Sequence, residues 1–158
     1  MNDLDFYRQY HQNPINKCIH FFCIPIISFC AINFLSSIVI IFQHKKTSTY
    51  QGQLIRGDEL AVIYYCFYYY INYGLFVSVI MKTYLHIVVY LADKFRINNN
   101  NWFRYNYIMF FVAWVFQFIG HYIEGQQPAI LQGVSQSFLV APMFVVQYIF
   151  PSFLQIPM

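Results

Sequence analysis

The chain has 158 residues, of which 59% are hydrophobic, 22% aromatic and only 9% charged. That composition excludes an ordinary soluble domain and predicts one integral-membrane domain over residues 1–158, embedded in a lipid bilayer. The formal net charge is only +3 and no basic run with interleaved aromatic residues is present, so nucleic acid is not an expected partner. The four cysteines form no close C-x-x-C pair, which indicates buried thiols rather than disulfides.

The first predicted span is Ile19–Phe42, a run without formal charge that is long enough to cross the hydrocarbon core. Asn13 can cap the helix that leads into this run, and Pro14 suits the first helical position. The run is too long for the apolar part of a cleaved signal peptide, and no small-x-small cleavage site follows it. We therefore expect it to be retained as a span.

Charged and polar residues mark the next boundaries. We expect a polar loop at 43–59, a second span at 60–81, a short apolar segment at 83–92, a solvated linker at 93–101 and a further span at 105–123.

The C-terminal tail carries no charge after Glu124. Prolines at four positions predict a broken or re-entrant helix there: Pro128, Pro142, Pro151 and Pro157. The predicted fold class is therefore all-α, a polytopic membrane helical bundle of about four spans plus a broken or re-entrant C-terminal helix.

Two histidines flank the start of the first span. His11 lies just before the Asn13 cap, and His20 lies about two turns inside the helix. Asn16 precedes His20 by one turn on the same helix face. The two imidazoles are either interfacial side chains beside a capped helix start or ligands of a metal ion.

Gln117, His121 and Glu124 follow one stripe of the later span, at spacings i, i+4 and i+7. An ionised carboxylate in or near hydrocarbon must neutralise, pair or bind a cation, so the stripe predicts a polar site. The alternative is that Glu124 lies at the level of the lipid headgroups, just beyond a helix end at Gly125.

The ends of two spans thus carry four candidate site residues: His11, His20, His121 and Glu124. Imidazole and carboxylate ligands with open positions suit non-haem iron(II), and zinc fits equally well from ligand type alone. His86 is a weaker candidate, and His44 in the first loop is not included.

The histidines also restrict the topology. His20 and His121 reach one membrane face only if the chain between their two spans crosses the bilayer an even number of times, and two crossings suit its apolar length. Residues 60–92 are therefore expected to form a helical hairpin bent around Lys82 and Thr83.

Three stretches together resemble the Mpo-like family of small membrane proteins: YHQNPINKCIH (residues 10–20), QFIGHYIEGQQPA (117–129) and QSFLVAPMFVV (136–146). The resemblance extends over nearly the whole chain, although the tract between the motifs, residues 43–104, resembles nothing in particular. Fungal members of that family are endoplasmic-reticulum 2-hydroxy-fatty-acid dioxygenases of phytosphingosine breakdown. The resemblance implies a multi-pass protein of that membrane and an Fe2+-dependent α-oxidation, in which a long-chain 2-hydroxy fatty acid reacts with O₂ and loses one carbon.

The resemblance assigns the family's motif residues to individual positions of this sequence. His11, His20 and His121 match its histidines and are the implied iron ligands. Glu124 matches its acidic position and is the implied catalytic residue, either as a fourth ligand or as the group that orients an imidazole, with Asn16 and Gln117 as supporting candidates. Pro128 matches the Pro-Ala position, whereas Gln126 and Gln127 stand where many members have basic residues.

Two other classes of function stay open on the residues alone. A proton-coupled transporter would place His121 and Glu124 inside a span as a relay without metal. A membrane scaffold would need neither residue.

Overall fold

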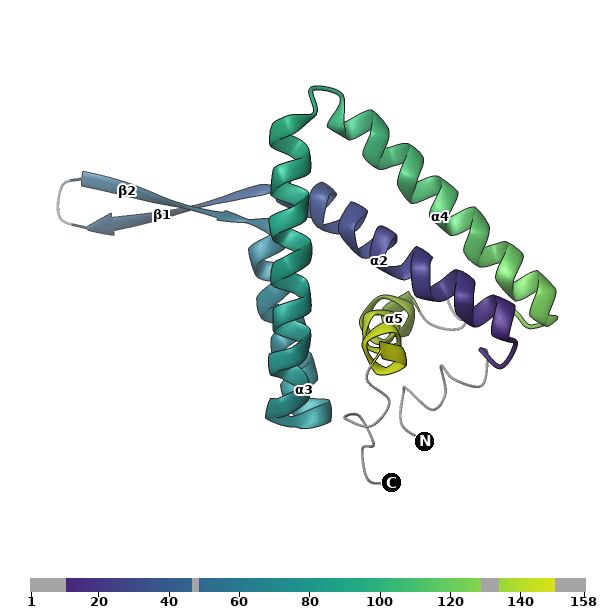
Figure 1. The fold of residues 1–158 in the computed structure, drawn as a ribbon. Helices are drawn as coiled ribbons and strands as arrows, with labels where there is room; N and C mark the ends of the chain where they lie inside the picture. The colour runs from purple at the N-terminus through teal and green to yellow at the C-terminus, as the bar shows by residue number, and fades with distance from the viewer. Residues whose placement is uncertain (1–10, 47–48, 129–133, 150–158) are drawn as a thin grey trace. The chain divides into compact units, whose positions relative to one another are not determined.

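The computed structural model describes residues 11–46, 49–128 and 134–149, with side chains given for 11–38, 55–128 and 138–149. Its elements in chain order are α2 (Pro14–Ser36), β1 (Val39–Lys46), β2 (Thr49–Arg56), α3 (Gly57–Asn98), α4 (Trp102–Glu124) and α5 (Val134–Ile149) (Figure 1). Helices α2, α3 and α4 are long and apolar enough to cross a membrane. The predicted class, a helical membrane bundle, is confirmed.

The chain divides into two compact units. One unit contains residues 1–30 and 101–158, and the other contains residues 31–100. The single domain expected over residues 1–158 stays a prediction, and the two units are described separately below.

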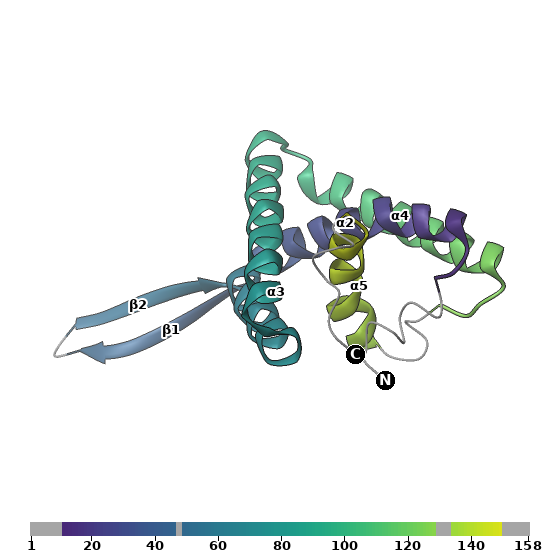
Figure 2. The same cartoon turned by 60° about the horizontal axis from the view of Figure 1, so that its bottom comes forward.

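In the first unit, α2 and α4 run antiparallel and side by side (Figures 1 and 2). The start of α2 is capped as predicted, because the Asn13 side-chain oxygen accepts the main-chain N–H of Ile15 at 2.8 Å. The Asn106 amide on α4 donates to the carbonyl of Cys30 at 3.1 Å and is buried. A small apolar core lies between these points, made by Cys23, Ile27 and Ala113 with Ile19, Phe110 and Trp114 against it.

Helix α5 packs onto this pair with an almost entirely apolar, buried surface. Its segment from Val140 to Val146 is buried throughout, and its Phe138 ring contacts the Trp114 ring with centroids 6.3 Å apart. The helix continues through Pro142, whereas the prolines were expected to divide this tail. Pro151 and Pro157 lie outside the described residues.

The second unit contains a β-hairpin where a polar loop was expected at 43–59. Strands β1 and β2 pair antiparallel, from Val39 opposite Arg56 to Lys46 opposite Thr49. The first helix consequently ends at Ser36 rather than at Phe42. The β-branched run that follows Ser37 favours an extended backbone.

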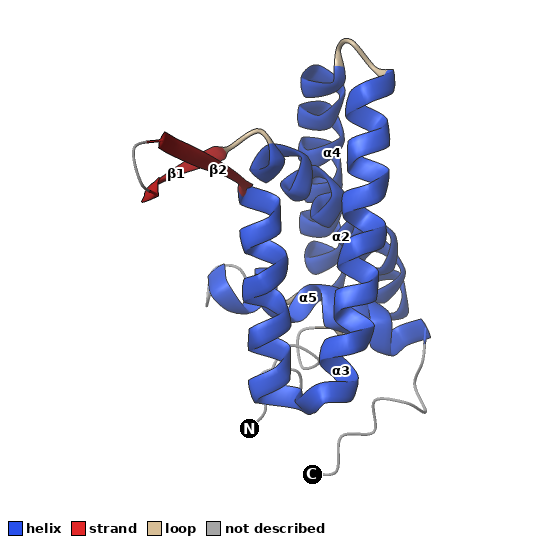
Figure 3. Cartoon of the chain, turned by 90° about the vertical axis from the view of Figure 1, so that its left-hand side faces the viewer, coloured by secondary structure: helices blue, strands red, loops and turns tan. Residues whose placement is uncertain are grey.

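Helix α3 is a hairpin, as predicted, but the position expected for its bend was wrong. The chain reverses at Gly74, with φ 84° and ψ 175°, and not at Lys82 and Thr83, which lie inside the second arm. Figure 3 shows the two arms of α3. The Ser78 hydroxyl donates to the carbonyl of Cys66 at 2.8 Å, which one straight helix would place about 18 Å apart. Glycine is the residue that tolerates this backbone conformation.

Ion pairs close the open end of the α3 hairpin. The Arg56 guanidinium pairs with Asp58 on the first arm and, at 2.9 Å, with Asp93 on the second arm. Arg96 also pairs with Asp93. Asp58 is fully buried, and the guanidinium partner beside it offsets the cost of removing that carboxylate from water.

Candidate metal centre

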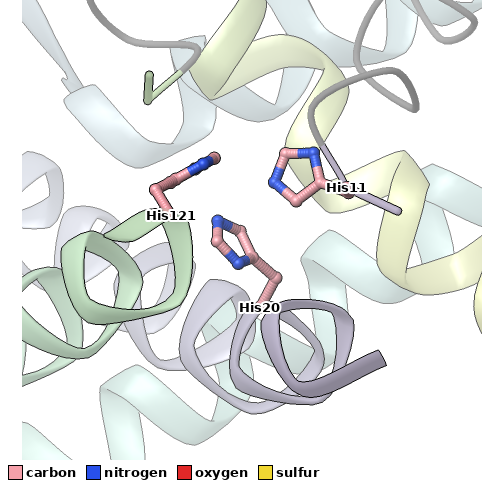
Figure 4. A group of neighbouring side chains, drawn as sticks. All are labelled: His11, His20 and His121. Atoms are coloured by element: carbon pink, nitrogen blue, oxygen red, sulfur yellow. The ribbon is translucent and has the colours of Figure 1, made fainter. Parts of the chain in front are cut away.

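Three segments of the first unit bring three imidazoles together. His11 lies just before α2, His20 lies in the second turn of α2, and His121 lies in the last turn of α4 (Figure 4). The ring centroids are 4.3 Å apart for His11 and His20, 5.0 Å for His11 and His121, and 4.8 Å for His20 and His121. One nitrogen from each ring lies within 4.8 Å of the other two.

All three imidazoles are removed from water, with exposed fractions of 1% for His11, 1% for His20 and 4% for His121. Positive charge on three such close rings would be unfavourable because of burial and mutual repulsion. Neutral imidazoles each carry one nitrogen lone pair, which is what a metal ion needs. Within the residues that the structure describes, the buried Nδ1 of His121 has no hydrogen-bond partner, so the donor set fits a metal ion.

A backbone contact fixes the orientation of His20. Its Nδ1 lies 3.0 Å from the carbonyl oxygen of Asn16, an oxygen that can only accept a hydrogen bond. Nδ1 therefore carries the proton and Nε2 keeps the lone pair. Metal-binding histidines in proteins commonly have this kind of carbonyl contact on the other nitrogen.

Glu124 lies one turn after His121 and holds the start of α2. Its Oε1 accepts the main-chain N–H of Gln12 and, at 2.9 Å, that of Asn13. Its Oε2 accepts the side-chain amide of Asn16. The carboxylate thus binds the positive end of a helix, and it is not among the ligand atoms that converge with the three imidazoles.

Comparisons with known proteins place the chain in a family. The family model described as "2-hydroxy-palmitic acid dioxygenase Mpo1-like" matches residues 2–153. The chain belongs to this family. It is 30% identical over 145 residues to the 2-hydroxy-palmitic acid dioxygenase MPO1 of Saccharomyces cerevisiae, an alignment that covers 91% of this chain and 75% of that protein. No solved structure is significantly similar to the chain.

In this Mpo1-like chain the structure brings together some of the sequence candidates and not others. His11, His20 and His121 form one group, with Glu124 and Asn16 directly beside it. Gln117 is buried on α4 one turn before His121. Within the described residues, the remaining positions are not members of this group. His86 is exposed on α3 with its Nδ1 at the carbonyl of Lys82, Gln126 and Gln127 are exposed, and the side chain of His44 is not described.

Two residues near the centre were not predicted from the sequence. Gly120 directly precedes His121, and a Cβ atom at this position would lie 2.3 Å from the side-chain oxygen of Asn16. Phe144 of α5 has its ring centroid 5.3 Å from that of His11 and is buried. Both residues lie within stretches that carry the family resemblance, 117–129 and 136–146, which is the sequence signal that could have found them.

Proposed function

We propose that this chain is an iron(II)-dependent dioxygenase of the endoplasmic-reticulum membrane. It converts long-chain 2-hydroxy fatty acids into fatty acids shorter by one carbon, a step in the breakdown of phytosphingosine. The observation that carries the proposal is the buried group of His11, His20 and His121, in a member of the family described by 2-hydroxy-palmitic acid dioxygenase. The 30% identity to the yeast enzyme of that name supports the same substrate class.

The proposed reaction balances with O₂ as the only co-substrate. R–CH(OH)–COOH and O₂ give R–COOH, CO₂ and H₂O, so the bond between the carboxyl carbon and the α-carbon breaks. The substrate gives up four electrons, and one O₂ accepts all four. No 2-oxoglutarate, flavin or nicotinamide is needed.

His11, His20 and His121 would hold the iron, with His20 directed by its contact to the Asn16 carbonyl. Iron(II) held by these residues would supply Lewis-acid and redox chemistry for the reaction of the 2-hydroxy acid with O₂. Zinc would suit the same ligands, but O₂ as the oxidant favours a metal with redox chemistry. The buried apolar segment of α5 beside His11 supports the proposal because it keeps water from the reacting groups.

The test is an aerobic incubation of the purified full-length chain with 2-hydroxypalmitate and iron(II). The expected result is the acid shorter by one carbon, with one CO₂ formed for each O₂ consumed. An anaerobic sample and the His121→Ala variant should form none, whereas the His86→Ala variant should match the wild type. Absence of the shorter acid in the wild type, or its formation at the same rate without O₂, would contradict the proposal.

A further inference from the structure

We propose that Asn16 is a positioning residue, which together with Glu124 and Gly120 sets the arrangement of the three histidines and hence the metal affinity. The inference rests on the proposed metal centre but not on the identity of the substrate. Three contacts carry it, and each involves a different atom group of Asn16.

The first contact joins Asn16 to His20. Asn16 is completely buried, and its carbonyl oxygen lies 3.0 Å from Nδ1 of His20. Any shift of this first turn of α2 therefore moves both the position of the imidazole and the acceptor that selects its protonated nitrogen.

The second contact joins Asn16 to the other two histidine segments through Glu124. The Asn16 amide donates to Oε2 of Glu124, which lies one turn beyond His121 on α4. The other oxygen of Glu124 accepts the main-chain N–H of Gln12, the residue next to His11. One carboxylate and one amide thus connect the three segments that carry the imidazoles.

The third contact is steric. A Cβ atom built on Gly120 would lie 2.3 Å from Oδ1 of Asn16, far inside ordinary van der Waals separation, and 3.3 Å from its Cγ, which is also tight. Glycine at position 120 therefore lets α4 approach α2 closely enough for Asn16 and Glu124 to meet. His121 follows directly, so a displacement of α4 here would move its imidazole as well.

A reciprocal exchange tests the bond between Asn16 and Glu124. Asn16→Asp places two carboxylates against each other, and Glu124→Gln places two amides against each other. In the double variant N16D/E124Q, the amide at position 124 donates to the carboxylate at position 16, and its carbonyl still accepts from Gln12 and Asn13. The double variant also keeps the net charge, with the anion in the first turn of α2, where the helix dipole favours it.

The measurement is an anaerobic titration of the full-length chain in detergent with cobalt(II), read by the visible absorbance of the bound metal. Each single variant is expected to bind roughly 10- to 100-fold more weakly than the wild type. The double variant is expected to return close to the wild-type affinity and spectrum. A double variant that binds as weakly as the weaker single variant would overturn the proposal.

A second pair of variants tests the steric contact. Gly120→Ala should weaken metal binding, whereas the double variant N16A/G120A should bind no more weakly than Asn16→Ala alone, because the alanine at position 16 removes the clashing oxygen. If the losses of metal affinity caused by Gly120→Ala and Asn16→Ala simply add in the double variant, the two substitutions do not act through one steric contact.

Asn106→Ala is the matched control, because Asn106 is an equally buried amide that joins the same two helices at the carbonyl of Cys30. It should lower thermal stability but leave the cobalt affinity unchanged. Loss of affinity equal to that of the Asn16 variants would overturn the specific role of Asn16. A wild-type chain that binds no cobalt or iron would instead refute the metal centre itself.

Discussion

Glu124 carries a carboxylate at the end of a helix that is apolar enough to cross a membrane, and its contacts explain how it is tolerated there. From the sequence, three roles stayed open for it: metal ligand, orienting group, or headgroup-level residue. Both oxygens accept hydrogen bonds from the start of α2, which brings the partial positive charge of that helix end to the carboxylate. These contacts favour the orienting role.

Two glycines have a positive φ, and replacing each of them tests the backbone conformation at that residue. Gly74 has φ 84° and ψ 175°, a region that is almost restricted to glycine, whereas Gly125 has φ 72° and ψ 19°, the ordinary left-handed conformation that ends α4. A Cβ atom at either position would meet nothing within 4 Å. Substitution by alanine therefore changes only the backbone energy.

Gly74→Ala is expected to lower the free energy of unfolding by up to about 3 kcal/mol, and Gly125→Ala by only about 1 kcal/mol. The measurement is equilibrium unfolding of each variant in mixed detergent micelles. Equal stability of Gly74→Ala and the wild type would mean that the chain does not reverse at this residue.

The ends of helices α2 and α4 were predictable from the sequence where residues within one turn determine them. Asn13 and Pro14 gave the start of α2, and Gly125 gave the end of α4, where the main-chain N–H of Gln126 donates to the carbonyl of His121. These signals act within one turn of the helix, so a single sequence contains them.

The α3 bend was misplaced, and the β-hairpin was missed, because charge and hydropathy were used to set the element boundaries. Lys82 interrupts the apolar run, yet an exposed lysine fits inside a helical arm, whereas Gly74 supplies the backbone conformation of a reversal. Likewise, the apolar residues after Ser37 resembled the end of a span, although their β-branched side chains suit β1.

The structure brings the three candidate histidines together. Asn16 was named from the sequence as a supporting candidate and Glu124 as a ligand or orienting group, but their contacts with one another and with Gly120 were not predicted. Asn16 meets Gly120 and Glu124 across more than a hundred residues of chain. Such a pairing depends on how α2 and α4 align, and no periodicity or spacing within one segment fixes that alignment. From the sequence, Asn16 was therefore a supporting candidate one turn from His20, but not the partner of Gly120 and Glu124.

For the whole molecule, the distribution of apolar side chains supports a bilayer environment. Large apolar residues on α3 and α4 stay exposed, among them Ile63, Phe67, Leu75, Phe103 and Phe111. Exposed apolar surface of this extent is typical of helices that face lipid rather than water.

We expect the two arms of α3 to cross the bilayer once each, which would bring Ser37 and Asn99 to one side of the membrane. In a chain whose native cysteines are replaced, single thiols at Ser37 and Asn99 should react with an impermeant reagent from one side of the membrane. Thiols at Gln12 and Asn72 should react from the other side. Asn72 is chosen because it lies two residues before the reversal at Gly74.

The matched control is the same set of thiols in permeabilised vesicles, where all four should react. Labelling of Ser37 and Asn99 from opposite sides would mean that α3 does not cross twice. In that case His20 and His121 could not meet at one membrane face.

If His11, His20 and His121 hold one iron ion, the iron content of the purified chain depends on all three histidines. After anaerobic loading with iron(II) and removal of excess metal, the wild type should retain about one iron per chain. His11→Ala, His20→Ala and His121→Ala should each lose it, because each removes one of three ligands, while His86→Ala, which alters an exposed histidine on α3, should retain it. A folded wild-type chain without iron, or retention of full iron content by the three variants, would mean that these histidines do not hold an iron ion.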